Sequence, residues 1–167
     1  MFCFKIFDFD KYFRVIDEDT IKEVTWGSGV YKDKSVLLWD LENITYNYFT
    51  KVKQLLRFAP ERSFIITTQE IKASKLKSMQ IDGFEVLTAH KTDSDAKIKN
   101  IYKILKGYDE FVLISSDSDF VDIGKKILTD GKKLTWIMSD VNKKRIIMKM
   151  DISHKNLKFI TLSRFEL

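Results

Sequence analysis

The chain has 167 residues, a formal net charge of +5, 44% hydrophobic residues and 13% aromatic residues. A chain of this length and composition can bury a substantial hydrophobic core, which excludes an intrinsically disordered protein and favours one main globular domain. No apolar run approaches the roughly 20 residues of a membrane helix, and acids interrupt the aromatic opening where a secretory signal needs an apolar stretch. We therefore expect a cytoplasmic protein without a membrane partner.

The chain has only one cysteine, Cys3, and two histidines. This excludes an internal disulfide and the common structural zinc sites, so any bound metal would need oxygen ligands. The lysines cluster within 97–106, 125–133 and 143–145. This clustering modestly favours a polyanionic partner, although on charge alone a solvated lysine-rich surface is the simpler interpretation.

The first 33 residues contain aromatic residues in a roughly alternating pattern and few helix signals. They predict a small β-rich extension, residues 1–33, that packs on a main domain over residues 34–167, since about 30 residues can scarcely bury a core alone. From residue 34 onward, short β-rich apolar runs alternate with segments of helical period. This rhythm predicts an α/β fold with a mainly parallel sheet covered by helices.

Five strands are predicted, over residues 35–40, 62–68, 83–89, 110–115 and 133–138. The first and fourth should be adjacent in the sheet. Acidic residues follow three of them: Asp40 ends the first, Asp93 and Asp95 follow the third, and Asp117 and Asp119 follow the fourth. Ligands of open α/β sheets collect at the carboxyl ends of the strands, so this edge is the candidate site.

An aspartate after a strand is also a common helix N-cap, an alternative that suits Asp93 well. Asp95 lies three residues before Ile98 and seven before Tyr102, on the apolar face of the predicted helix, and should point inward. Asp119 should also point inward, because Ser118 or Ser116 could cap the helix that begins there, whereas Asp122 should be solvated.

Inward carboxylates at one edge of a basic protein repel one another unless a cation binds between them. Mg²⁺ and Mn²⁺ are hard ions that prefer carboxylate, water and phosphate oxygens. The pattern therefore predicts a Mg²⁺ or Mn²⁺ site formed by Asp40, Asp95, Asp117 and Asp119. Such a site can activate water and orient a phosphodiester, which is the usual chemistry of metal-dependent nucleases.

Four segments resemble the successive motifs of the NYN branch of the PIN-like nucleases: WDLENI (39–44), KTDSDAKI (91–98), ISSDSDFVDIGKKI (114–127) and GKKLTWI (131–137). The resemblance covers roughly residues 35–138 and implies a Rossmann-like, three-layer fold, a metal-dependent acidic site and cleavage of RNA. It implies catalytic and metal-binding roles for the same four aspartates. The family commonly has glycine at the position of Ser116 and near Thr92, so Asp93 stays an alternative to Asp95.

The resemblance also implies that Asn43 hydrogen-bonds a carboxylate or a substrate phosphate, although an ordinary helix-start residue is an equal alternative. The other residues predicted to bind substrate are Ser116, Lys91, Lys143 and Lys144, with lysines at the rim holding the rest of a polyanion. The predicted partner is nucleic acid, RNA more than DNA. The oligomeric state stays open, with a homodimer among the states allowed.

Two other interpretations compete with a nuclease. A phosphatase of the haloacid-dehalogenase type needs D-x-D after its first strand, but here Leu41 and Glu42 follow Asp40. A catalytically weak module of the same fold could bind RNA or protein, although the complete acidic set would oppose nucleic-acid binding. Dinucleotide binding is not indicated, because no G-x-G-x-x-G follows the first strand.

Overall fold

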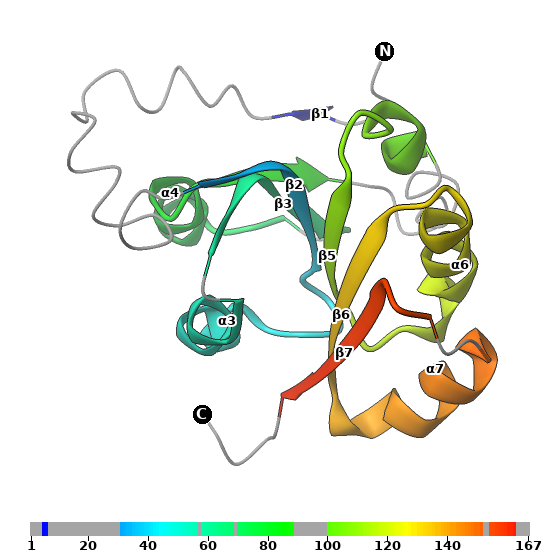
Figure 1. Cartoon of the computed structure of the whole chain (residues 1–167). Coiled ribbons are helices and arrows are strands. Elements are labelled where there is room, and N and C mark those ends of the chain that lie inside the picture. The colour runs from blue at the N-terminus through cyan, green and yellow to red at the C-terminus, as the bar shows by residue number, and fades with distance from the viewer. Residues whose placement is uncertain are drawn as a thin grey trace.

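The computed structural model describes residues 5–6, 31–56, 58–68, 70–88, 100–151 and 154–162. Within these residues one seven-stranded sheet has the order β1-β4-β3-β2-β5-β6-β7 (Figure 1). The strands are β1 (Lys5–Ile6), β2 (Tyr31–Asp40), β3 (Ala59–Thr67), β4 (Phe84–Thr88), β5 (Glu110–Ile114), β6 (Lys133–Ser139) and β7 (Leu157–Leu162). Every pairing is parallel except that of β1 with β4.

The strand order reverses at the centre of the sheet. From β2 the chain proceeds outward through β3 to β4, and it then returns to the other side of β2 and proceeds outward through β5 and β6 to β7. The predicted α/β fold and the predicted adjacency of the first and fourth strands are confirmed. Because ligands of open α/β sheets bind where the strand order reverses, the crevice between the carboxyl ends of β2 and β5 is the expected site.

Helices cover both faces of the sheet (Figure 1). One face carries α3 (Phe49–Leu56), which follows the short η1 (Tyr46–Tyr48), and α4 (Ala73–Ile81). The other face carries helical residues 100–104, α6 (Val121–Thr129) after η2 (Ser118–Phe120), and α7 (Lys143–Met150) after η3 (Asp140–Asn142). This is the three-layer arrangement that the resemblance implies.

Successive residues of the central strand pack into different layers. Leu37 and Trp39 of β2 belong to the core on the α3 side, whereas Val36 and Leu38 belong to the core on the α6 side, and all four are at most 2% exposed. A parallel strand that is buried on both faces produces a continuous apolar run rather than an alternating one. The run SVLLWD is therefore recognisable in the sequence and brings Asp40 to the carboxyl edge.

The sheet has one more parallel strand than the five predicted. β7 pairs with β6 at the edge of the sheet, and its side chains are mostly half-buried. β2 also begins at Tyr31, three residues before the predicted domain boundary. The rest of the predicted β-rich extension, apart from the two-residue β1, lies outside the described residues.

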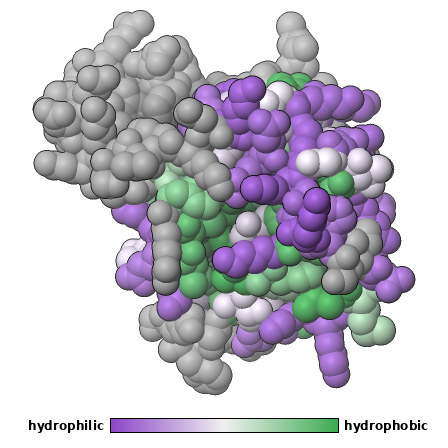
Figure 2. Space-filling model, viewed as in Figure 1, coloured by the Kyte–Doolittle hydropathy of each residue, from purple (hydrophilic) through white to green (hydrophobic). Residues whose placement is uncertain are grey.

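On the face shown in Figure 2, hydrophilic residues surround a band of hydrophobic ones. Among the described residues, the large hydrophobic side chains that are exposed are Ile104, Val141, Ile147 and Met148. No helix in the described part of the chain is both long and apolar enough to cross a membrane.

Candidate active site at the carboxyl edge of the sheet

Asp40, the last residue of β2, is the most buried carboxylate of the site, with 8% of its surface exposed. Its Oδ2 atom accepts two hydrogen bonds, from Nδ2 of Asn43 at 2.5 Å and from Oγ of Ser115 at 2.7 Å. Oδ1 accepts no hydrogen bond from any described residue. Oδ2 therefore fixes the orientation of the carboxylate, and none of the described residues occupies Oδ1.

Ser115 connects the ends of β2 and β5. Its hydroxyl donates to Asp40 and accepts from the backbone N–H of Asp117 at 3.0 Å, while its carbonyl accepts the indole N–H of Trp136 at 2.8 Å. Sequence reasoning did not select Ser115. The predicted adjacency of the first and fourth strands could have indicated Ser115. In the observed register Trp39 pairs with Ile114, so the next residues, Asp40 and Ser115, lie side by side.

Asp117 caps the short helix that follows β5. Its Oδ1 accepts the backbone N–H of Asp119 at 2.9 Å, which is the N-cap interaction of η2. Asp117 therefore caps this helix, and not Ser118 or Ser116, the two residues considered as possible caps. The predicted inward position of Asp119 is wrong, since this side chain is exposed, whereas Asp122 is exposed as predicted. Asp117 is half-buried. It accepts a hydrogen bond from Asp119 and donates one to Ser115, which in turn donates to Asp40.

The environment of Asp40 disfavours its charged form. Burial is the main cause that raises the pKa of this carboxyl above its ordinary value, and the negative charges of Asp117 and Glu42 raise it further. The hydrogen bonds from Ser115 and Asn43 act in the opposite direction without cancelling the effect. Asp40 and Asp117 are thus close enough to repel each other, and a cation beside them would relieve that repulsion.

The donor chemistry of this pair fits a hard cation. Asp40 and Asp117 offer carboxylate oxygens, which Mg²⁺ and Mn²⁺ prefer, and no described residue donates to Oδ1 of Asp40. Among the described residues, no three His, Cys, Asp or Glu side chains form a group that could hold a metal. Another predicted ligand, Asp95, and its alternative Asp93 lie outside the described residues. Of the predicted set, the described residues include Asp40, Asp117 and the exposed Asp119, and Asp40 and Asp117 are the two whose charges interact.

The predicted substrate-binding residues have different environments. Asn43 binds the carboxylate of Asp40, one of the two roles expected for it. Ser116 is 5% exposed, and its hydroxyl lies 2.7 Å from the hydroxyl of Ser139 and accepts the backbone N–H of Ser139 at 2.9 Å. These contacts join the loop after β5 to the end of β6. Lys143 and Lys144 are exposed in the first turn of α7, which follows β6 at the same edge. Lys91 lies outside the described residues.

Replacing Asp40 by asparagine should stabilise the metal-free fold at neutral pH. Because the folded-state pKa is raised, the folded chain binds this proton more tightly than the unfolded chain. The resulting stability is fully present below the unfolded pKa and is lost as the pH rises through the folded pKa. Asparagine has no such loss and can still accept from Ser115 and Asn43. In EDTA, the melting temperature of Asp40→Asn relative to that of the wild type should rise as the pH increases from about 4 to about 8. A difference in melting temperature that is independent of pH would contradict this result.

Comparison with known proteins agrees with the geometry. The family model described as the NYN domain matches residues 34–154, which extends the resemblance beyond the strand at 133–138. No curated protein matches the chain. A crystal structure of a protein of unknown function from Vibrio parahaemolyticus RIMD 2210633 is similar, with a TM-score of 0.57 and 18% identity over 80% of this chain and 96% of that chain. At this identity the likeness shows the fold alone. The family match covers most of the chain, which therefore belongs to the NYN domain family of PIN-like nucleases.

Proposed function

We propose that this protein is a metal-dependent endoribonuclease that hydrolyses phosphodiester bonds of single-stranded or structured RNA. The observation that carries the proposal is the buried carboxylate of Asp40, bridged by Ser115 to the Asp117 loop where the strand order reverses. A buried carboxylate with a raised pKa beside a second carboxylate is costly for a fold. Such an arrangement is typical of a functional site, and membership of the NYN domain family supports nuclease chemistry.

The carboxylates have distinct roles in this proposal. Asp40 and Asp117 would hold Mg²⁺ or Mn²⁺, with Asp119 and Asp95 as the further predicted ligands. When bound, the metal supplies a Lewis acid that lowers the pKa of water and neutralises charge on the phosphodiester. Ser115 and Asn43 both bind Oδ2 of Asp40 and so prevent its rotation. Ligand orientation of this kind typically affects metal affinity or activity by about 10–100-fold.

The substrate must approach an edge that carries like charge. Without a cation, Asp40, Asp117 and the exposed Glu42 would repel a phosphodiester. Lys143 and Lys144 lie in the first turn of α7 at the same edge and would attract the flanking phosphates. Because the lysines at the rim attract phosphates and the carboxylates at the centre repel them, a bound metal would be needed to bring the phosphodiester to the carboxylates.

The test is cleavage of an internally labelled single-stranded RNA by the purified chain with Mn²⁺ or Mg²⁺. We expect internal cuts that stop when EDTA is added, and slower cutting of a DNA strand of the same sequence. Release of phosphate from monoesters without internal cuts would instead indicate a phosphatase. Retention of RNA without any product would indicate a binding module, and either result would overturn the proposal.

A further inference from the structure

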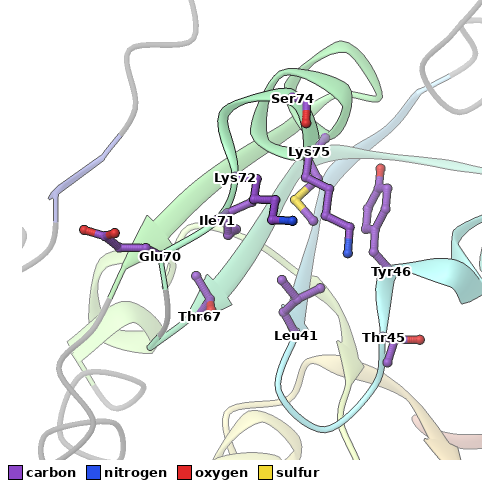
Figure 3. A pocket seen from close by; sticks show the side chains of 10 residues that line it. Leu41, Thr45, Tyr46, Thr67, Glu70, Ile71, Lys72, Ser74 and Lys75 are labelled. Carbon is purple, nitrogen blue, oxygen red and sulfur yellow. The ribbon is translucent and has the colours of Figure 1, made fainter.

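A pocket of about 460 Å³ lies beside the candidate active site at the carboxyl edge of the sheet (Figure 3). It lies between the loop after β2 and the segment that connects β3 to α4. Leu41, which lines it, directly follows Asp40, and its backbone N–H donates to the carbonyl of Ile66 at 3.1 Å. Thr67, the last residue of β3, lines it as well. The volume lies within the range of about 300–1,000 Å³ that is usual for small-molecule sites.

One wall of the pocket is a fixed aromatic ring. Tyr46 stacks on Phe49 with ring centroids 5.2 Å apart and an angle of 11° between the rings. Its hydroxyl donates to Oδ2 of Asp82 at 2.5 Å, and burial raises its pKa, so it stays protonated at neutral pH. Ile71 and Met79 add apolar surface. Trp39 and Phe84 also lie against the Tyr46 ring, with centroids 5.5 and 5.7 Å away, so a base can pack only against the part of the ring that lines the pocket.

The opposite side of the pocket is positively charged. The side chains of Lys72 and Lys75, at the start of α4, extend into the space toward Leu41 and Tyr46 (Figure 3). Neither ammonium group forms an ion pair with another described residue. Among the described lining residues Glu70 is the one acid, so these residues carry an excess of positive charge from the two lysines. An anionic group in the pocket would therefore be attracted by both ammonium groups.

We infer that this pocket binds one nucleotide of single-stranded RNA, next to the phosphodiester that is cut. The base would pack against Tyr46 and the apolar residues, and the phosphate would bind Lys72 and Lys75. A nucleotide uses both halves of the lining, whereas a simple anion would leave the aromatic wall uncovered and an apolar ligand would bury the ammonium groups without a partner. The position next to the cut rests on the proposed nuclease function, but occupancy of the pocket does not require cleavage.

Binding in EDTA tests this inference without any contribution from cleavage. The probes are a single-stranded RNA oligonucleotide, the four nucleoside 5′-monophosphates and inorganic phosphate, each with the full chain. The double variant Lys72→Ala with Lys75→Ala should bind the oligonucleotide at least tenfold more weakly. The slope of log affinity against log salt should fall by about 0.7, since the two lysines hold one phosphate and each phosphate contact to a single strand contributes about 0.7. Lys77→Ala is the matched control, because Lys77 is exposed on the same helix and does not line the pocket.

A second variant separates the pocket from its charge. Ser74 is exposed and lines the pocket at the start of α4, so Ser74→Trp should fill the space without changing the charge. It should abolish binding of the monophosphates that the wild type binds and leave the weak binding of inorganic phosphate intact. Thermal melts establish that each variant is folded.

The inference would be overturned if the double lysine variant bound RNA no more weakly than Lys77→Ala. It would also be overturned if inorganic phosphate bound as tightly as every monophosphate, or if Ser74→Trp left monophosphate binding unchanged. These results are independent of the nuclease proposal. Pocket binding without metal-dependent cleavage would overturn the nuclease proposal alone, and cleavage without pocket binding would overturn the nucleotide site alone.

Discussion

Asp40→Asn and Asp117→Asn should each reduce metal-dependent RNA cleavage at least about a hundredfold, because loss even of a residue that orients a metal ligand costs about 10–100-fold. RNA binding should stay intact or become stronger, because each change also removes a negative charge from the edge that meets the phosphates. This separation of cleavage from binding is specific to carboxylates that act on the reacting phosphodiester, since unfolding would abolish both activities.

Single-turnover cleavage and binding of the same labelled RNA measure the two effects. Asp122→Asn is the matched control, because Asp122 is exposed in the first turn of α6, five residues after Asp117, and loses the same charge. It should cleave at nearly the wild-type rate. Fragments that are identical in pattern and rate for the wild type and Asp117→Asn would assign the activity to a contaminant and show that the catalytic assignment is wrong.

Trp136→Ala should be among the most destabilising single changes in the described core. Trp136 of β6 is fully buried, and it packs near Phe159 of β7 with ring centroids 6.3 Å apart. It also lies close to Gly124 of α6, where an added Cβ atom would be 3.3 Å from the indole ring. Removing a buried tryptophan side chain typically costs about 3–5 kcal/mol. For a protein of this size that loss lowers the melting temperature by about 10 °C.

The indole of Trp136 also supports the site, so a milder change should separate packing from positioning. Trp136→Phe keeps most of the apolar volume but leaves the buried carbonyl of Ser115 without its donor. We expect a smaller loss of stability than in Trp136→Ala and a measurable loss of cleavage rate in protein that remains folded. Phe159→Ala, at a half-buried position, is the control and should destabilise less than Trp136→Ala. Equal melting temperatures for the wild type and Trp136→Ala would contradict the expected packing role.

The layers of the fold were predictable because burial on both faces leaves a clear signal. The runs at 36–39 and 111–114 are continuously apolar, and both lie in central parallel strands. β7 was missed because an edge strand with mostly half-buried side chains has no comparable run. Its pairing with β6 depends on a tertiary contact rather than on a local preference.

The candidate site was predictable in outline and not in its hydrogen bonds. Asp40 could be placed beside Asp117 because two parallel strands end at one edge. The hydrogen-bond partners of the neighbouring residues could not be predicted, because they depend on side-chain directions across different strands. Ser116 binds Ser139, Ser115 binds Asp40, and Asp117 rather than a serine caps η2. The three consecutive polar residues Ser115, Ser116 and Asp117 therefore have three different roles.

The hydrogen bond between Ser115 and Asp40 also affects the order in which the molecule assembles. It joins residues 75 positions apart, and β2 lies between β3, which is synthesised soon after it, and β5, which is synthesised much later. Contacts between residues so far apart in sequence form slowly, because the chain loses the entropy of closing a long loop before the contact can offset that loss. During synthesis, Asp40 therefore stays without Ser115 and Asp117 until β5 has emerged. The central strand keeps one unpaired edge for the same interval, which makes this the stage most prone to intermolecular strand pairing.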